Sequence, residues 1–386
     1  MARLGDVCDI LNGFAFKSEQ YVDDGIRIIR IANVQKGYIE DSTPVFYSFD
    51  SREAKKYSLE EGDMLMSLTG NVGRVSKLSK EFLPAALNQR VACLRIKDGV
   101  TLDKAFLFNL LNSDYFEQQC IAASKGVAQK NMSTEWLKEY EIPMFPMEQQ
   151  KVIASVLDKV TELISLRKEQ LAKLDQLVKS RFIELFGDPV QNPFKWDTKP
   201  LLEMGYCKNG MNFHTGDSGI EMHCLGVGDF KDYSVIDGTD HLPTISLNET
   251  PPAESMLQNG DIVFVRSNGN KALVGRCLVV YPHDTPTTYS GFCIRYRLTS
   301  DEVKTAYLLR VLKTESIRKK MAGRGANIQN LNQQILASLD IPIPPMEIQE
   351  QFTSFIKQTD KSKLAIQRSL NKLELLKKAL MQEYFG

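Results

Sequence analysis

The stretch IPMFPMEQQ, at residues 142–150, returns as IPIPPMEIQ at residues 341–349, so that Ile142 and Ile341 are 199 residues apart. Other matching pairs keep this offset or drift from it by at most three residues. They are Asn131 with Asn330 and Phe186-Gly187 with Phe385-Gly386 at 199, Gly62-Asp63 with Gly260-Asp261 at 198, Gly73-Arg74 with Gly275-Arg276 at 202, and Asn12-Gly13 with Asn209-Gly210 at 197. A solenoid repeats every ~20–50 residues, so this much longer period predicts one domain-sized unit written twice.

Each repeated stretch opens a segment of forty residues that contains neither glycine nor proline, 147–186 and 346–385. Apolar residues recur in these segments with a heptad spacing, which predicts two long helices. Forty residues at ~1.5 Å each span roughly 60 Å, more than one small domain needs to be covered. We therefore expect the two helices to pair with each other, as in a coiled coil, and to run antiparallel.

With Ile153 at heptad position a, the apolar stripe of both segments occupies positions a and d, and position e widens it in the first segment through Leu157, Ile164 and Leu171. Polar residues interrupt the stripe, so the pair is not a regular zipper. The residues predicted at the helix interface are Ile153, Val156, Val160, Leu163, Leu174 and Leu177 in the first helix, and Phe352, Phe355, Ile366, Leu373, Leu376 and Leu380 in the second.

The sequence before each long helix mixes β-branched and aromatic runs such as GIRIIRIANV and DIVFVR with turn signals, and short helical stretches follow. This order is typical of a small mixed α/β domain. The predicted fold class is therefore α+β, with two similar globular domains joined by two long antiparallel helices and related by a pseudo-two-fold internal repeat.

Composition is that of an ordinary globular chain, with 386 residues, 43% hydrophobic and 25% charged. No apolar run approaches the ~18 residues of a membrane span, and the first residues do not resemble a secretory signal. Seven cysteines without a C-x-x-C spacing are typical of reduced thiols. We expect a cytoplasmic protein without membrane contact.

The net charge is zero, yet the charges are segregated in the second repeat. Residues 259–330 carry twelve Lys or Arg against five Asp or Glu, whereas residues 200–258 carry two against nine. One interpretation is that charge varies by chance along a chain of this length. The functional interpretation is one basic face that meets a polyanion.

Catalytic motifs are not found: the sequence has no G-x-S-x-G and no phosphate-binding P-loop. Three weak alternatives are His214, His223 and Cys224 as metal ligands, Asn192-Pro193-Phe194 as a methyltransferase motif, and Asp284, Glu302 and Lys304 as a nuclease centre. None has the spacing that its chemistry requires, and none recurs in both repeats. We expect no catalytic residue and no metal site in this chain.

Two loops recur instead, and both are rich in small, amide and basic residues. Such loops let the backbone approach a phosphate while Asn, Gln, Arg and Lys reach phosphates or base edges. For each residue alone, an ordinary turn is the competing interpretation. The residues predicted to bind DNA are Ser67, Thr69, Asn71, Arg74, Lys125, Gln129, Lys130 and Asn131 in the first repeat, and Arg266, Asn268, Asn270, Lys271, Arg276, Arg324, Asn327, Gln329 and Asn330 in the second.

Three groups of residues resemble those of the specificity (S) subunits of type I restriction–modification enzymes. They are Leu185-Phe186-Gly187-Asp188-Pro189 followed by Asn192-Pro193 and Trp196, the Ile-Pro-x-x-Pro-Met-Glu-x-Gln run that opens each long segment, and Asn12-Gly13-Phe14-Ala15-Phe16-Lys17-Ser18 with Gly25-Ile26. The resemblance covers the whole chain. It adds Lys17 to the candidate DNA-binding residues.

The resemblance implies two target recognition domains, 1–146 and 187–345, and two spacer helices, 147–186 and 346–386. Each domain would read one half of a bipartite, asymmetric site on double-stranded DNA, and the helices would fix the spacing. The partners implied are two modification (methyltransferase) subunits and restriction (translocase and nuclease) subunits. S-adenosylmethionine, ATP and Mg²⁺ would be bound only by those partners.

Two alternatives from other functional classes stay open on the residues alone. One is a self-contained DNA-modifying enzyme, either a methyltransferase or a nuclease. The other is a coiled-coil adaptor that never contacts DNA and therefore lacks the steep salt dependence of phosphate binding.

Overall fold

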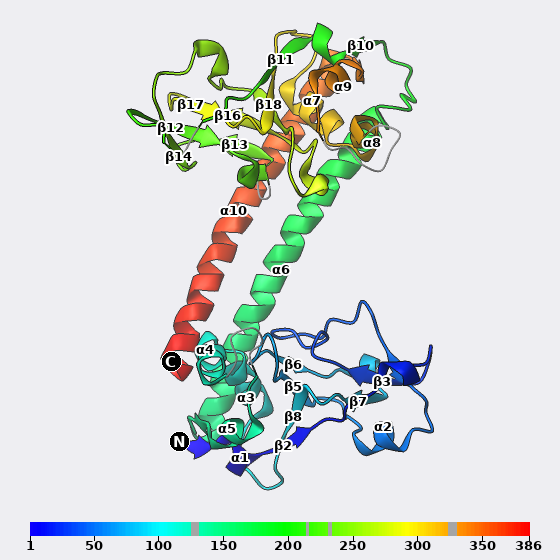
Figure 1. The fold of residues 1–386 in the computed structure, drawn as a ribbon, viewed down its shortest axis with the longest axis vertical. Helices are drawn as coiled ribbons and strands as arrows, with labels where there is room; N and C mark the ends of the chain where they lie inside the picture. Colours follow the sequence, from blue (N-terminus) through cyan, green and yellow to red (C-terminus); the bar gives the residue numbers. More distant parts are fainter. Residues whose placement is uncertain (125–130, 214–215, 231–233, 323–329) are drawn as a thin grey trace. The chain divides into compact units, whose positions relative to one another are not determined.

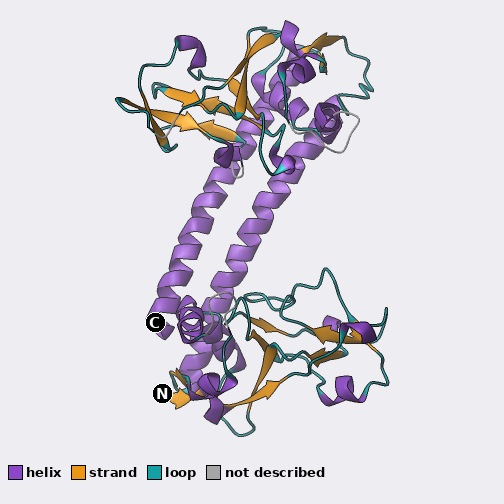
Figure 2. Ribbon diagram, viewed as in Figure 1, coloured by secondary structure: helices purple, strands orange, loops and turns teal. Residues whose placement is uncertain are grey.

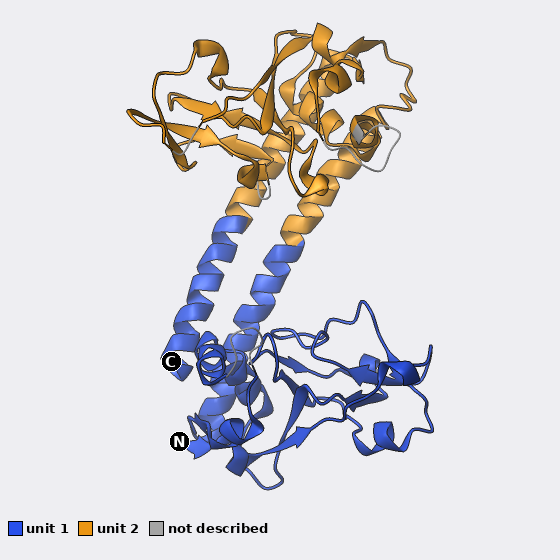
Figure 3. Ribbon diagram, viewed as in Figure 1, with its two compact units in different colours: residues 1–169, 367–386 blue, residues 170–366 orange. Residues whose placement is uncertain are grey.

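The computed structural model describes residues 1–124, 131–213, 216–230, 234–322 and 330–386. The chain divides into two compact units, unit 1 with Met1–Glu169 and Gln367–Gly386, and unit 2 with Gln170–Ile366 (Figure 3). The long helices α6 (Met147–Phe186) and α10 (Met346–Phe385) each contribute to both units.

Unit 1 contains a four-stranded antiparallel sheet in the order β2-β8-β5-β6 and a three-stranded sheet in the order β4-β3-β7, while β1 pairs with β9 (Figures 1 and 2). Its strands are β1 (Ala2–Arg3), β2 (Cys8–Asn12), β3 (Ile26–Ile29), β4 (Phe46–Tyr47), β5 (Met64–Ser67), β6 (Val75–Lys77), β7 (Ala85–Leu87), β8 (Val91–Ile96) and β9 (Glu141–Ile142). Its shorter helices are α1 (Leu4–Val7), α2 (Arg52–Lys56), α3 (Lys104–Leu111), α4 (Asp114–Ala123) and α5 (Thr134–Glu139).

Unit 2 repeats this arrangement with a five-stranded sheet in the order β11-β18-β15-β16-β13 and a three-stranded sheet in the order β14-β12-β17. Its strands are β10 (Thr198–Pro200), β11 (Gly205–Asn209), β12 (Ile220–Leu225), β13 (Val235–Asp237), β14 (Thr244–Leu247), β15 (Asp261–Val265), β16 (Cys277–Tyr281), β17 (Thr287–Tyr289), β18 (Cys293–Leu298) and β19 (Asp340–Pro342). Its shorter helices are α7 (Thr305–Leu312), α8 (Glu315–Ala322) and α9 (Gln333–Ala337). The shared strand order confirms the repeat where sequence identity alone is weak.

The central strand of each unit is covered on both faces, which explains its uninterrupted apolar sequence. In β5, Met64 and Met66 join the core beneath α3 and α4, whereas Leu65 joins the core toward the second sheet. In β15, Ile262 and Phe264 likewise join the core beneath the helices, whereas Val263 joins the core on the other face of the sheet. Alternate residues of a strand point to opposite faces, so burial on both faces requires apolar residues throughout.

A buried ion pair closes the Gly-Asp turn that precedes each central strand. Asp63 accepts hydrogen bonds from Nε and Nη2 of Arg95 at 2.8 and 2.7 Å, and Asp261 accepts both from Arg297 at 2.8 Å. The glycine before each aspartate has a positive φ, which favours glycine. The repeated Gly-Asp pair therefore anchors the start of the strand on the neighbouring strand β8 or β18.

The glutamine that ends each repeated Pro-Met-Glu-x-Gln run attaches a long helix to its own unit. Gln150 is fully buried, accepts a hydrogen bond from the Asp103 amide at 2.8 Å and donates to the Phe145 carbonyl at 2.7 Å. Gln349, also fully buried, accepts from the Lys304 amide at 2.8 Å and donates to the Glu302 and Pro344 carbonyls at 2.9 Å. The repeated glutamine is thus a structural residue.

The two long helices run antiparallel within each unit. In unit 2, Phe182 packs on Phe352 with ring centroids 5.6 Å apart, while Asp175, earlier on α6, pairs with Lys363, later on α10. In unit 1, Lys168 pairs with Glu374 at 3.1 Å. Nearer the start of α6, Leu157 shares a core with Phe385, at the end of α10.

The register of the buried stripe differs from the predicted one. Position e is buried together with position a. In α6, Leu157 is fully buried and Val178 is 2% exposed, and in α10 Leu370 is 5% exposed. Position d faces outward in four cases, which corrects the prediction for Val156, Leu163, Leu177 and Leu376, exposed by 37, 41, 49 and 47%. Positions a and e are also 3.5 residues apart on average, and from Ile153 onward only e is apolar in every heptad of α6.

The other predicted interface residues are buried or half-buried. Ile153, Val160 and Phe352 are buried. The half-buried residues are Leu174, Phe355, Ile366, Leu373 and Leu380.

Candidate nucleic-acid interface

The loop after β5, residues 67–74, is the first predicted DNA-binding loop, and its inner residues are used to shape it. Ser67 is fully buried, its hydroxyl donates to the Asn71 carbonyl, and it accepts from the Arg74 amide at 3.2 Å. We therefore correct the prediction for Ser67, which holds the loop and cannot reach a ligand. Asn71 and Gly70 are exposed at the tip.

The second predicted loop of unit 1 meets the first. Asn131 forms an antiparallel bridge with Thr69, and the Met132 amide donates to the Leu68 carbonyl at 2.9 Å. Asn131 is exposed, whereas Thr69 is 8% exposed. Two segments about sixty residues apart in the sequence thus form one surface. Lys125, Gln129 and Lys130 lie outside the described residues.

Unit 2 repeats this junction at the matching positions. Asn330 forms an antiparallel bridge with Ser267, and the Leu331 amide donates to the Arg266 carbonyl at 2.8 Å. Arg266 is half-buried, and its Nη1 donates to the Gly291 carbonyl at 3.3 Å. Arg324, Asn327 and Gln329 lie outside the described residues.

The remaining predicted residues of the unit 2 loop divide by exposure. Asn268 is half-buried and its side chain accepts from the Asn270 amide at 2.7 Å. Asn270 is exposed, but its side-chain oxygen already accepts a hydrogen bond from the Ala272 amide at 3.1 Å. Lys271 is exposed and Arg276 is half-buried.

Lys17 is exposed but belongs to another part of unit 1. Tyr47, in the three-stranded sheet, donates from its hydroxyl to the Lys17 carbonyl at 2.8 Å and accepts from the Lys17 amide at 2.6 Å. No contact among the described residues brings Lys17 to the loop at 67–74. The structure therefore brings together the two repeated loops but not this residue.

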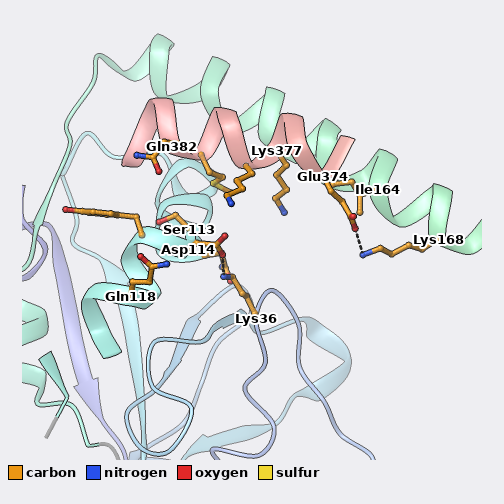
Figure 4. A pocket seen from close by; sticks show the side chains of 13 residues that line it. Lys36, Ser113, Asp114, Gln118, Ile164, Lys168, Glu374, Lys377 and Gln382 are labelled. Atoms are coloured by element: carbon orange, nitrogen blue, oxygen red, sulfur yellow. Dashed lines mark hydrogen bonds and ion pairs between the residues drawn. The ribbon is translucent and has the colours of Figure 1, made fainter. Parts of the chain in front are cut away.

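The loop at residues 35–38 also borders the first predicted DNA-binding loop, and sequence reasoning missed it. Arg74 donates to the side chain of Gln35, and the Gly37 amide donates to the Val75 carbonyl at 2.9 Å. Figure 4 shows Lys36, from the same loop, reaching Asp114 on α4, at 2.6 Å. This hydrogen bond lowers the pKa of the Asp114 carboxyl. Lys36 also binds Glu117 at 2.7 Å, so the loop is fixed to α4.

Two exposed side chains beside the loops were also missed. Phe292 is 60% exposed, and its carbonyl accepts from the Arg266 amide at 2.7 Å. Arg90, at the matching place in unit 1, is exposed, and its carbonyl accepts from the Leu68 amide at 3.0 Å. An aromatic face or a guanidinium here can stack on or bind nucleic acid. The signal available in the sequence was their position just before strands β18 and β8.

The weak catalytic alternatives do not assemble in the part of the chain that the structure describes. Glu302 pairs with Lys199 at 2.6 Å, while Lys304 pairs with Glu350 at 3.1 Å, so this acid and this lysine do not converge. Burial raises the pKa of the Cys224 thiol to about 12, which disfavours a thiolate ligand. Among the described residues no group of three or more His, Cys, Asp or Glu is placed to hold a metal ion.

None of the described helices is both long enough and apolar enough to cross a membrane.

Comparison with known proteins gives one consistent result. The model of the family described as type I restriction modification DNA specificity domain matches residues 1–176 and 232–375. The StySPI type I restriction enzyme specificity subunit of Salmonella potsdam is 23% identical over 412 residues, covering 100% of this chain and 88% of the relative. The EcoKI specificity subunit of Escherichia coli (strain K12) is 23% identical over 388 residues, covering 93% and 81%.

The fold has a solved counterpart as well. The crystal structure of the S subunit of a type I restriction–modification system from M. genitalium matches with a TM-score of 0.59 at 16% identity, covering 100% of this chain and 95% of that one. At this identity the match bears on the fold alone. The family model spans most of the chain and both units, and this protein belongs to the family of type I restriction–modification DNA specificity domains.

Proposed function

We propose that this chain is the DNA-recognition subunit of a type I restriction–modification complex, in which each unit reads one half of a bipartite, asymmetric site. The observation that carries the proposal is the loop junction, Thr69 with Asn131 and Ser267 with Asn330, which recurs at the same place in both units. A duplicated surface built from dissimilar residues suits two different half-sites. Two-fold related readers on DNA are a common geometry.

The part of each unit that binds DNA is the exposed rim of its loop junction. In unit 1 this rim includes Asn71, Asn131 and Arg90; in unit 2 it includes Lys271, Asn330 and Phe292. Amide side chains suit adenine edges, and cations suit phosphates and guanine. We assign target recognition to residues 1–146 and 187–345.

The long helices set the distance between half-sites and bind the partner subunits. Nine large apolar side chains on the described helices α6 and α10 are exposed by 37–68%: Val152, Val156, Leu163, Leu166, Leu177 and Ile183 on α6, and Leu364, Leu375 and Leu376 on α10. A face of this kind, rimmed by charge, is typical of an interaction surface. We propose two modification subunits as its occupants, with restriction subunits added to that complex.

The chemistry then belongs to the partners. Methyl transfer from S-adenosylmethionine, ATP hydrolysis and Mg²⁺ binding need motifs that the modification and restriction subunits would supply. The complex would act in the cytoplasm, where the genome is accessible. The purified chain alone would bind DNA weakly and catalyse nothing.

The experiment is an electrophoretic or anisotropy assay of the assembled complex on duplexes that carry both half-sites, one half-site or neither. We expect affinity to fall when either half-site is scrambled and to decrease steeply with salt, because phosphate contacts release counterions. Affinity that is insensitive to salt would instead favour an adaptor that does not contact DNA. Methyl transfer or cleavage by the chain alone would favour the enzyme alternative.

A further inference from the structure

Unit 2 contains a second candidate site, a cavity of ≈750 Å³ at the junction of its helices and its five-stranded sheet. Val178 of α6, Leu309 of α7, Ile356 of α10 and Val279 of β16 form apolar walls. The size falls within the range of ~300–1,000 Å³ that is usual for small-molecule sites. It therefore has room for a ligand of nucleotide size.

The cavity is rich in cations from three helices. The basic residues that line it are Lys179 of α6, Arg310 of α7, Lys313 just after α7, and Lys357 and Lys363 of α10. Lys363 pairs with Asp175 at 2.5 Å, and Lys313 donates to the Ser234 hydroxyl at 2.7 Å. The structure gives Arg310 and Lys357 neither a hydrogen bond nor an ion pair from their side chains to any described residue.

The surroundings of Arg310 leave its charge incompletely compensated. Burial lowers the pKa of Arg310 and that of Lys313, although Asp175 and Asp360 act on Arg310 in the opposite direction. Burial also raises the pKa of the Asp360 carboxyl. A bound anion would supply the compensation that the protein does not.

Unit 1 provides an internal comparison, because the helices correspond position by position. The sixth residue of α3 is Asn109 where α7 has Arg310, and the twelfth residue of α6 is Asp158 where α10 has Lys357. Asn109 donates to Asp158 at 2.8 Å, so unit 1 closes this place with its own hydrogen bond. Unit 2 replaces both partners of that bond with cations.

A position three residues further along the chain also carries a neutral residue in unit 1 and a cation in unit 2. Asn112, just after α3, lines a smaller cavity of ≈390 Å³ in unit 1, and its counterpart after α7 is Lys313. In the unit 1 cavity two lysines are already held by carboxylates, Lys36 by Asp114 and Lys168 by Glu374 (Figure 4). Lys377 and Lys378 also line the unit 1 cavity, without a hydrogen bond or ion pair to any described residue. What is particular to unit 2 is therefore the pair of cations at the places that Asn109 and Asp158 occupy in unit 1.

We propose that the cavity of unit 2 binds an organic phosphate of nucleotide size, with Arg310 and Lys357 as its phosphate ligands and Val279, Leu309 and Ile356 against its apolar body. A guanidinium binds two phosphate oxygens at once, and a lysine adds a point charge. This site is distinct from the loop junction and goes beyond DNA recognition. The phosphate has two sources to distinguish, a free nucleotide and the phosphodiester backbone of DNA.

The test uses the full chain in complex with its modification subunits only, because the restriction subunits would themselves bind ADP. This complex is titrated calorimetrically at low salt with inorganic pyrophosphate and separately with ADP. We expect saturable binding of both below about 1 mM, and tighter binding of ADP because its base contacts the apolar walls. The decisive variant, Arg310→Asn with Lys357→Asp, transplants the Asn109–Asp158 pair of unit 1. It should weaken both ligands at least about tenfold, since two charge-assisted hydrogen bonds are lost.

The matched control is Lys195→Asn with Lys361→Asp, two exposed residues of unit 2 that change the net charge equally. The control should leave ADP binding within about twofold, because neither Lys195 nor Lys361 lines the cavity. If DNA is the source, the transplant also lowers DNA affinity and pyrophosphate competes with DNA. If a free nucleotide is the source, the transplant abolishes ADP binding and leaves DNA affinity unchanged.

Two results would overturn the proposal. One is that neither pyrophosphate nor ADP binds the wild-type complex and the transplant leaves DNA affinity unchanged. The other is that the transplant and the control weaken binding equally, which would place the anion elsewhere. A thermal unfolding measurement on the transplant excludes loss of the fold as the cause.

Discussion

Asn131 lies in an antiparallel bridge opposite Thr69, so that two loops far apart in the sequence share one edge. The same bridge joins Asn330 to Ser267 in unit 2. The inner residue of each bridge belongs to the loop after the central strand, and the outer asparagine is exposed. Each unit therefore presents one composite surface, and this surface is the basis of the predictions about DNA.

We expect Phe292→Ala to weaken DNA binding by about 1–3 kcal/mol, because it removes an exposed aromatic face beside the unit 2 loop on which a base can stack. Phe49→Ala, in unit 1 and outside the loop junction, is the comparison at another exposed aromatic, 51% against 60%. Anisotropy on duplexes with single scrambled half-sites measures the effect. Loss of affinity for both half-sites in the Phe292 variant would contradict the assignment.

We expect Arg297→Met to destabilise unit 2 by about 1–3 kcal/mol, because the buried Asp261 carboxylate loses two charge-assisted hydrogen bonds and keeps only the ion pair with Arg295 at 3.9 Å. Asp261 is 1% exposed and receives two hydrogen bonds from Arg297. Denaturant unfolding measures the change. Lys361→Met, at an exposed position of the same unit, should alter stability by less than about 0.5 kcal/mol.

We expect Gln349→Leu to loosen the first turn of α10, because three backbone groups lose their partner at a cost of about 1–3 kcal/mol for each group left buried and unpaired. The control is Gln351→Leu, two residues further and exposed. Hydrogen exchange of the amides in 302–304 and 345–352 reports the effect. Equal protection in the two variants would show that the buried amide is dispensable.

We expect the stability of unit 1 to depend on acid through Asp114. Because Lys36 lowers the pKa of this carboxyl in the folded chain, the stabilisation is fully present above the ordinary value of about 4 and is lost as the pH falls through the lowered value. The difference in unfolding free energy between wild type and Lys36→Met should therefore shrink at acid pH. A constant difference between pH 7 and pH 2 would contradict this reading.

We expect removal of one heptad from both long helices, 164–170 and 363–369, to shorten the permitted distance between half-sites. Seven residues at ~1.5 Å per residue amount to ~10 Å, or about three base pairs at ~3.4 Å each. Removing whole heptads keeps the buried seam in register. An unchanged distance would mean that the helices do not set the spacing.

Much of the fold could be predicted because the sequence states it twice. The repeat identified matching residues in both copies, and the absence of glycine and proline predicted the extents of both long helices. The helix seam was placed one position off, because Val156 and Leu163 at position d are as apolar as Leu157 and Ile164 at position e. Heptad spacing alone does not say which of two adjacent stripes is buried.

The candidate site was predicted in part, and the limits are physical. The loops could be found from repeated Asn, Gly and Arg residues, but their contact at Thr69 and Asn131 depends on chain folding over about sixty residues. Ser67 was predicted to bind DNA because of its hydroxyl, but in the structure this hydroxyl donates a hydrogen bond to the Asn71 carbonyl inside the loop. Arg90 and Phe292 occupy matching places in the two units but are residues of different types. A comparison of the two repeats in sequence therefore does not pair them, and only the fold does.

The most direct test of the central claim is a genome-wide map of methylated sites for complexes carrying Asn71→Ala or Arg266→Ala. Asn71 belongs to the unit 1 loop and Arg266 to the unit 2 loop. We expect each variant to relax the base preference in one half-site only, a different half for each, with a loss of about 1–3 kcal/mol in discrimination. Relaxation of both half-sites by either variant, or of the same half-site by both, would contradict the account.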